Sequence, residues 1–274
     1  MSQLRPRPAP PAGLGVGHVF RGALLIVITG LRAEARIASA PGVSVFACNG
    51  NVGLRAQAIK RAVSAGAPAI LSFGVAGGLS SHLTAGDWVV ATGVISGSQR
   101  IETNNEWSSR LAERLPGAEL GDIVTVEDPV LHPIHKRRLN MATGASAVDM
   151  ESFQAAVLSD ELGIPFAAVR VIADAANQKL PSAAALGLRP DGSVAIGAVA
   201  RSLLRKPSQI PSLVSVTVAA LIAFRELLRG RERLGPHFAS LLSPELRGEL
   251  TETLNLSTPT DFAFQVGCGC QVMI

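Results

Sequence analysis

The chain has 274 residues, of which 47% are hydrophobic, with 27 glycines, 4% aromatic residues and no tyrosine. This composition suits a closely packed α/β core and excludes an aromatic-lined binder of single-stranded nucleic acid. The net charge of +4 is modest. It permits an anionic partner without requiring one, and we predict no nucleic-acid partner.

Residues 1–20 are rich in Pro, Gly and Arg and lack hydrophobic periodicity, which predicts a disordered tail. The first apolar run, Ala23–Thr29, is short and is followed at once by charged residues. A signal peptide would need small residues for cleavage there, so this run is a predicted buried strand. The three cysteines form no disulfide framework, and a cytoplasmic location is predicted.

Short apolar segments and helical segments then alternate along the chain. The predicted strands are Ala23–Thr29, Val43–Cys48, Ala69–Phe73, Trp88–Val94, Ile123–Val126 and Phe166–Ala173. Apolar side chains recur at helical spacing in Val52–Ala65 and Glu151–Leu162. This alternation predicts one α/β domain over residues 21–235, with a central mixed, largely parallel sheet flanked by helices.

Two further helices are predicted at Ser193–Lys206 and Pro211–Leu228. The apolar part of the second is shorter than the ~20 residues that a membrane-spanning helix needs. Arginines flank it, so residues 201–233 form either a core-packing helix with a solvated basic end or a peripheral contact with an anionic membrane. Residues 236–274 lose periodicity and are treated as a variable C-terminal tail.

Ligands of such sheets bind at the carboxyl ends of the strands. Gly30–Glu34 follows the first predicted strand, and the glycine-rich run Gly74, Val75, Ala76, Gly77 follows the third. Glycines there let the backbone approach a ligand closely, which makes this run a candidate substrate-binding segment. A tight turn without a ligand is the alternative.

Two acidic positions complete the candidate site. Glu151 stands at the start of a helical run, where a carboxylate can accept hydrogen bonds from two adjacent ribose hydroxyls or can simply favour the helix dipole. Asp174 ends the last apolar strand, where it is a candidate general acid or a helix cap.

Three ordered blocks resemble the purine nucleoside phosphorylase/nucleosidase superfamily, and most closely its methylthioadenosine/S-adenosylhomocysteine nucleosidase type. They are Ile70–Leu79 with Ala85–Val90, Val148–Glu151, and Val169–Asp174. The resemblance covers about residues 22–206 and implies the nucleoside phosphorylase-like fold and a purine nucleosidase or phosphorylase activity. It also implies a homo-oligomer.

A narrower resemblance is to the hopanoid-associated phosphorylases. It lies in Gly30–Arg36, in Gly187–Gly192 and in the arginine-rich segment Arg225–Arg233. It implies release of adenine from adenosylhopane in hopanoid biosynthesis.

The superfamily resemblance also implies roles for individual residues. Asp174 would protonate the purine at N7, with its pKa raised by burial. Glu151 would bind the 2′- and 3′-hydroxyls of ribose, with Met150 packed under the sugar. Val130 stands where the nucleosidases stack an aromatic ring on adenine, so Phe153 is the candidate replacement.

The attacking group is water or phosphate. By resemblance, Ser72, Val75 and Glu34 replace phosphate-binding residues of the phosphorylases, and Glu34 would act as base on water, which favours hydrolysis. Arg32, Arg36 and Arg55 remain candidate phosphate ligands, with phosphate as co-substrate.

Other functions stay open beside hydrolysis. In place of hydrolysis of adenosylhopane, the chain could be a methylthioadenosine/S-adenosylhomocysteine nucleosidase or a phosphate-dependent purine nucleoside phosphorylase. It could also be a non-enzymatic nucleoside-binding or membrane-associated scaffold protein. The histidines show no metal-ligand pattern, and neither a metal nor a cofactor is predicted.

Overall fold

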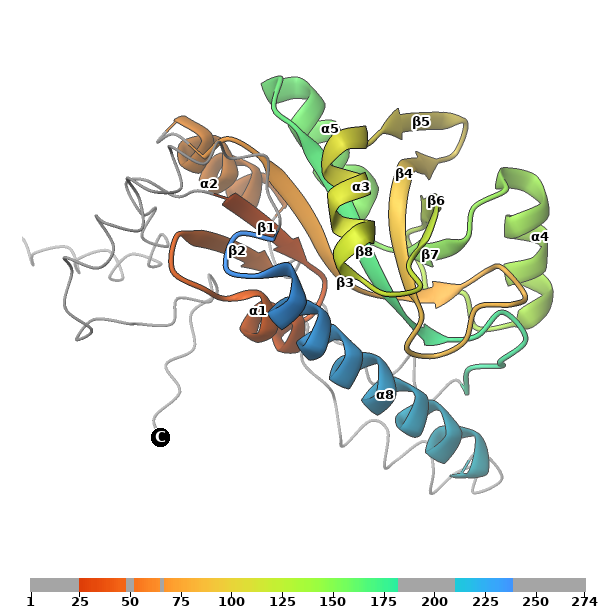
Figure 1. Ribbon diagram of the computed structural model, residues 1–274. Coiled ribbons are helices and arrows are strands. Elements are labelled where there is room, and N and C mark those ends of the chain that lie inside the picture. The colour runs from red at the N-terminus through yellow and green to blue at the C-terminus, as the bar shows by residue number, and fades with distance from the viewer. Residues whose placement is uncertain (1–24, 48–51, 65–66, 182–209, 239–274) are drawn as a thin grey trace, which may run out of the picture.

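Strands and helices alternate in the computed structural model as the apolar pattern predicts (Figure 1). The structure describes residues 25–47, 52–64, 67–181 and 210–238. The strands are β1 (Leu25–Thr29), β2 (Val43–Ala47), β3 (Ile70–Gly78), β4 (Trp88–Ser96), β5 (Gln99–Glu102), β6 (Glu119–Thr125), β7 (Ala147–Asp149) and β8 (Phe166–Asp174). The helices are α1 (Arg32–Ala38), α2 (Val52–Ser64), α3 (Asn105–Arg114), α4 (Pro133–Thr143), α5 (Ser152–Leu162) and α8 (Ile210–Leu234). The predicted tail 1–20 and the predicted helix Ser193–Lys206 lie outside the described residues.

All eight strands belong to one sheet, in the order β2-β1-β3-β7-β6-β4-β5, with β8 paired to both β3 and β4. Five pairings are parallel and three are antiparallel, which confirms the predicted mixed, largely parallel sheet. Pairing runs from β3 through β8, β4, β6 and β7 back to β3, so these strands close into a ring.

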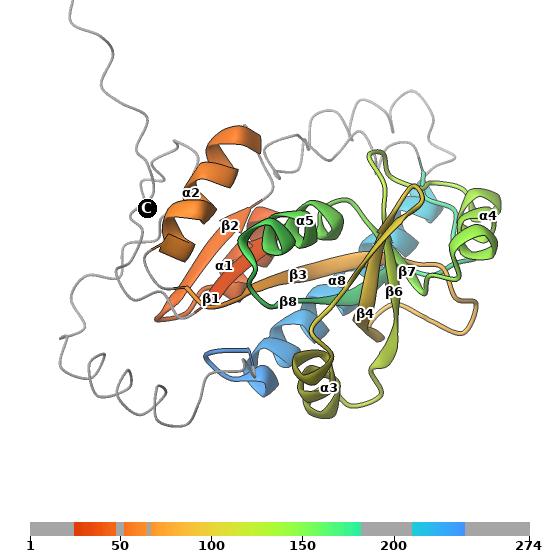
Figure 2. The same cartoon turned by 90° about the horizontal axis from the view of Figure 1, so that it is seen from above.

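The sheet has an apolar layer on each face because successive side chains of a strand point to opposite sides. On β1, Ile26 and Ile28 pack with α2 and α5, whereas Leu25 and Val27 pack with the cluster that includes α3 and α8. Figure 2 shows α2 and α5 on one side of β1 and β3, with α3 and α8 on the other.

The last helix, α8, is longer than the predicted Pro211–Leu228 and packs closely on the sheet. A Cβ atom at Gly230 would lie 2.1 Å from the indole of Trp88, so only glycine allows this approach. Beyond the helix, Phe238 is fully buried, and its carbonyl accepts a hydrogen bond of 2.9 Å from Trp107 Nε1. The packed domain therefore extends three residues past the predicted boundary at 235.

The glycine-rich run, predicted to follow the third strand, is itself part of that strand. β3 continues through Gly78, in parallel register with β8 and antiparallel to β7. Glycines stand in this strand because carboxylates occupy the space that a side chain would fill. A Cβ atom at Gly74 would meet Glu34, and a Cβ atom at Gly77 would meet Asp174.

Candidate active site

Glu34 is held by three backbone N–H groups from two separate segments. It lies in the first turn of α1 and is 2% exposed. Its Oε2 accepts hydrogen bonds from Gly30 N at 2.8 Å and Leu31 N at 2.7 Å, and its Oε1 accepts one from Val75 N at 2.8 Å. The hydrogen bonds from Gly30 N and Leu31 N provide acceptors for backbone N–H groups at the start of α1, as a capping glutamate does. The third ties α1 to β3.

This environment makes Glu34 a candidate base. A carboxylate offers about four acceptor positions, and three are occupied, which leaves one for a water molecule. Burial raises the pKa of Glu34, while Arg170 and the three N–H donors oppose that rise. A raised pKa makes the carboxylate a stronger proton acceptor.

Glu151 lies beside Glu34, across Gly30. It follows β7 and stands at the N-cap of α5, with its side chain 20% exposed. A Cβ atom at Gly30 would lie 2.6 Å from Glu151 Oε1, and the N–H of the same glycine binds Glu34. Burial and the carboxylates of Asp149 and Glu34 raise the pKa of Glu151 to about 8, against the opposing effect of Arg170.

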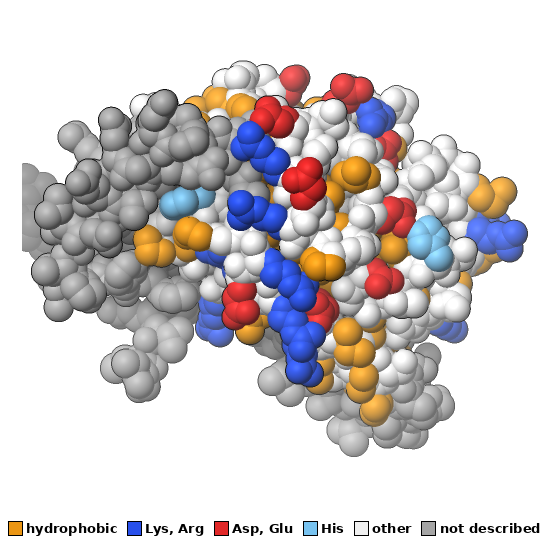
Figure 3. Space-filling view, in the orientation of Figure 1, with side chains coloured by type: hydrophobic (Ala, Val, Ile, Leu, Met, Phe, Trp, Pro, Cys, Tyr) orange, Lys and Arg blue, Asp and Glu red, His pale blue; other side chains and the backbone are white. Residues whose placement is uncertain are grey.

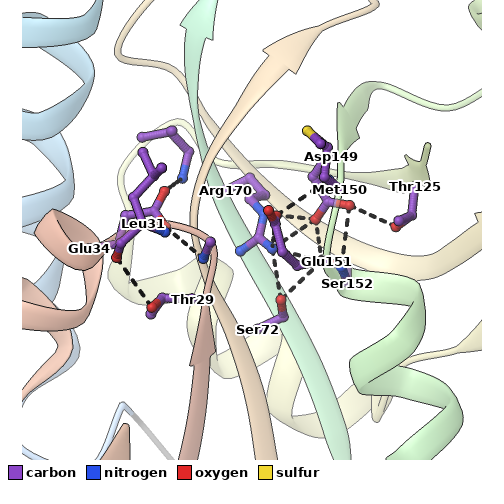
Figure 4. A network of polar contacts seen from close by, with 12 residues as sticks. Thr29, Leu31, Glu34, Ser72, Thr125, Asp149, Met150, Glu151, Ser152 and Arg170 are labelled. Carbon is purple, nitrogen blue, oxygen red and sulfur yellow. Dashed lines mark hydrogen bonds and ion pairs between the residues drawn. The ribbon is translucent and has the colours of Figure 1, made fainter. Parts of the chain in front are cut away.

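Arg170 is the buried cation among these acids (Figure 4). Its Nε donates to Asp149 Oδ2 at 2.9 Å, and its Nη2 donates to Ser72 Oγ at 2.7 Å and Ser152 Oγ at 3.0 Å. Glu151 Oε2 lies 3.8 Å from Nη2. Arg170 was not predicted as a site residue, although a lone charge inside a buried apolar strand indicates a buried partner.

Asp149 supports the site without facing it. Its side chain is 1% exposed and accepts hydrogen bonds from Arg170, from Thr125 Oγ1 at 2.7 Å, and from both the N–H and the hydroxyl of Ser152. With its acceptor positions filled by protein donors, Asp149 fixes the junction of β7 and α5. That junction places Glu151.

Asp174 ends β8 and forms an ion pair with a lysine that sequence analysis did not single out. Lys136 of α4 has a 1% exposed side chain, and its Nζ contacts Asp174 Oδ2. Burial raises the pKa of Asp174, as expected, but Lys136 opposes that rise. No local pattern distinguishes this lysine from its exposed basic neighbours, so only the packing of α4 reveals it.

Glu34 and Asp174 lie along one stretch of β3, and Glu151 lies beside Gly30 next to Glu34. Gly74 adjoins Glu34, and a Cβ atom at Gly77 would lie 3.3 Å from Asp174 Oδ2. These two glycines are about 10 Å apart at the spacing of an extended strand. The structure thus brings the predicted acids, which come from distant parts of the chain, to one end of the sheet.

The remaining predicted ligand residues differ in their exposure. Met150 is 39% exposed next to Glu151, and Val75 is half-buried on β3, so both are accessible to a ligand. Phe153 is wrong as a stacking residue, because its side chain packs in the core between the sheet and α5. Val130 packs with the apolar cluster beside β6 and β7.

The structure describes the side chains of two of the three candidate phosphate ligands. Arg32 is half-buried and Arg36 is exposed, both on α1, and the side chain of Arg55 lies outside the described residues.

Within the described residues, no group of three or more His, Cys, Asp or Glu side chains could hold a metal ion. None of the helices seen there is both long enough and apolar enough to cross a membrane.

The fold is that of the phosphorylase superfamily. The model of the phosphorylase superfamily matches residues 36–205, more than half of the chain. The chain belongs to this superfamily. A comparison with curated proteins found no match.

Solved structures show the same fold at low sequence identity. The 5′-methylthioadenosine/S-adenosylhomocysteine nucleosidase of Helicobacter pylori, in complex with butyl-thio-DADMe-Immucillin-A, is 17% identical, with a TM-score of 0.52 over 77% of this chain and 98% of that one. Futalosine hydrolase of the same species is 15% identical, with a TM-score of 0.51 over 76% and 96%. The nucleosidase of Campylobacter jejuni is 15% identical, with a TM-score of 0.50 over 76% and 100%.

Proposed function

We propose that this chain hydrolyses the N-glycosidic bond of a purine nucleoside and releases adenine from a 5′-substituted adenosine. Asp174 protonates the leaving base, Glu151 binds the ribose hydroxyls, and Glu34 takes a proton from the attacking water. The observation that supports this proposal best is the pair of carboxylates, Glu34 and Glu151, on either side of Gly30.

This pair of carboxylates favours water over phosphate. A phosphate dianion beside them would be repelled unless a cation balanced its charge. The nearest buried cation, Arg170, already donates to Asp149, Ser72 and Ser152, and its Nη1 donates to the carbonyl of Val169 at 3.3 Å. It has at most one of its five N–H donors left for a ligand.

The same charges suit the reaction. Cleavage passes through a sugar with oxocarbenium character, which is cationic and is stabilised by nearby carboxylates. Glu151 in its ionised form accepts hydrogen bonds from both vicinal hydroxyls, and its raised pKa strengthens it as an acceptor. Substrate binding then shifts Glu151 toward its ionised form, because two O–H donors stabilise the carboxylate.

The test is an assay of purified protein with methylthioadenosine, inosine and adenosylhopane, each with and without inorganic phosphate. We expect free adenine and a free sugar from the 5′-substituted adenosines, at a rate that phosphate does not change. Inosine would release hypoxanthine and tests selectivity for the base. A sugar 1-phosphate product would instead identify a phosphorylase. Release of no base from any nucleoside would overturn the proposal and leave the nucleoside-binding alternative.

Two variants test whether Glu34 acts as the base. Glu34→Gln is expected to lower kcat by about a hundredfold to ten-thousandfold, the range for loss of an acid–base group. Glu161→Gln changes a glutamate of α5 that is 55% exposed, and it should leave kcat unchanged. Full activity of Glu34→Gln would contradict the role of Glu34.

We further propose adenosylhopane as the natural substrate. Two of the three segments that resemble the hopanoid-associated phosphorylases, Gly30–Arg36 and Arg225–Arg233, lie among the described residues, and Gly187–Gly192 lies outside them. A hopanoid is dissolved in the membrane, so its enzyme must meet the substrate at the bilayer surface. Hydrolysis of adenosylhopane faster than methylthioadenosine supports this assignment, and the reverse order assigns the chain to methylthioadenosine.

The exposed face of α8 supports contact with the cytoplasmic surface of an anionic membrane. Large apolar side chains lie exposed on this helix at Val214, Val218, Leu221, Ile222 and Leu228. Arginines follow toward its C-terminal end, and Figure 3 shows a band of basic side chains beside apolar ones on this side of the molecule. Apolar and basic side chains together are what an interfacial helix presents to anionic lipid. The flanking residues 201–209 lie outside the described part.

Co-sedimentation with phosphatidylglycerol vesicles tests this contact. Arg225→Glu is expected to weaken binding by about 30-fold. Each basic residue near such a surface contributes about 1 kcal/mol, and reversal of the charge adds a repulsion of similar size, about 2 kcal/mol together. We also propose a homo-oligomer, and sedimentation velocity of the same variant separates the two uses of this face. Unchanged lipid binding with conversion to a monomer would assign α8 to subunit contact.

A further inference from the structure

Lys136 is a buried cation whose contacts all lie at the end of β8. Its side chain is 1% exposed, and its Nζ contacts the Asp174 carboxylate, the Asp174 carbonyl at 3.4 Å and the Ala175 carbonyl at 2.8 Å. These three acceptors match the three N–H donors of an ammonium group. A buried ammonium is tolerated only when it is paired in this way.

The ion pair bears on how Asp174 can act as an acid. A carboxyl group must hold a proton before it can give one to a base, but in an ion pair the proton is on the lysine. Burial raises the pKa of Asp174, and the ammonium group of Lys136 opposes that rise. A buried lysine can release a proton, whereas an arginine cannot.

We propose that Lys136 is a positioning residue that orients Asp174 and holds the proton that Asp174 delivers to the leaving base. This inference rests on the proposed function. As the bond between C1′ and the purine nitrogen breaks, its electron pair goes to the purine. Lys136 Nζ first transfers its proton to Asp174, and the protonated Asp174 then gives a proton to a purine nitrogen. Lys136 is left neutral, and a proton from solvent returns to it through the partly exposed Asp174 after the base departs.

Few other charged groups lie near this pair. Lys136 is the only charged group that acts on Asp174 among the described residues. His132 and His135 lie at the start of the same helix, are exposed, and have ring centroids 5.9 Å apart. The path from Lys136 to the base therefore runs through Asp174.

Two substrates separate a proton-holding role from a purely structural one. Methylthioadenosine releases adenine, which needs a proton, whereas 4-nitrophenyl β-D-ribofuranoside releases a stable phenolate that needs none. Without Lys136, Asp174 has no partner that orients it or returns its proton after each turnover. Lys136→Met is therefore expected to lower kcat on methylthioadenosine by about a hundredfold but on the nitrophenyl riboside by less than about threefold, because only the first leaving group depends on acid catalysis. Lys60→Met changes a lysine of α2 that is 52% exposed, and should alter neither rate.

Lys136→Arg covers the case in which the methionine variant does not fold. Arginine keeps the charge and the ion pair but cannot release its proton, so it should also lose about a hundredfold on methylthioadenosine. Wild-type activity of the arginine variant would overturn the inference, as would equal losses on both substrates by a folded methionine variant. If the wild-type protein releases no base from any nucleoside, the proposed function fails instead.

Discussion

Replacement of Glu151 by glutamine should stabilise the protein at alkaline pH while impairing sugar binding. The carboxyl is surrounded by low-dielectric protein and by the charges of Asp149 and Glu34, which raise its pKa from 4.5 to about 8. Between these pH values the folded protein keeps a proton that the unfolded chain releases. The free energy of unfolding of the wild type therefore falls as pH rises through this window.

The magnitude follows from the pKa change. A tenfold change in proton affinity corresponds to about 1.4 kcal/mol, so the full change from 4.5 to about 8 amounts to about 5 kcal/mol. Most of it, about 4 kcal/mol, falls between pH values of about 5 and 9. Glutamine has a similar shape and no titrating proton, so the variant escapes this loss.

Urea denaturation of both proteins at these two pH values measures the effect. The midpoint of the variant relative to the wild type should rise by about 1.5 M from the acidic to the alkaline condition, at a typical dependence on urea. The exposed Glu161→Gln variant is the control and should follow the wild type at both pH values. Parallel pH dependence of wild type and Glu151→Gln would refute the assigned burial and charge environment of Glu151.

Three further substitutions test the close packing around the acids. Gly74→Ala places a Cβ atom 2.6 Å from Glu34 Oε1, and the displaced carboxylate should lower kcat by about a hundredfold in steady-state assays. Gly30→Ala crowds Glu151 in the same way and should instead raise KM about tenfold, since it weakens binding of the sugar. Equal effects of the two glycine variants on kcat and on KM would contradict the separate roles of Glu34 in catalysis and Glu151 in sugar binding. Arg170→Met leaves a buried carboxylate without its counter-charge and should lower the free energy of unfolding by about 3–5 kcal/mol in urea denaturation, whereas an unchanged midpoint would show that the pair is not buried.

The longer apolar segments could be predicted from the sequence, because strands buried on both faces, such as β1, β4 and β8, contain a continuous apolar run. The errors lie where residues are not apolar: β3 continues five residues beyond its predicted end, and β6 begins four residues before its predicted start. The helices α3 and α4 escaped prediction, and so did the shorter elements. β7 has three residues and α1 has seven, too few for periodicity to appear above chance.

Site residues could be predicted where they directly follow a strand, because the end of the strand then fixes their location in the fold. Asp174 and the Gly30–Glu34 segment follow strands whose carboxyl ends meet, so their convergence follows from a parallel sheet. Phe153 was assigned wrongly because its distance in sequence from Glu151 does not reveal which side of α5 it occupies. That side packs against the sheet.

The sequence by itself determined the class of fold and which acids stand at strand ends, because burial requires apolar runs and parallel strands place their ends together. Only the tertiary structure decided the charge state and orientation of those acids. The partners that set them, Arg170 for Glu151 and Lys136 for Asp174, come from elements distant in sequence. Their contacts depend on strand register and helix packing, and pairing between buried charges depends on distances of a few ångströms that no local pattern specifies.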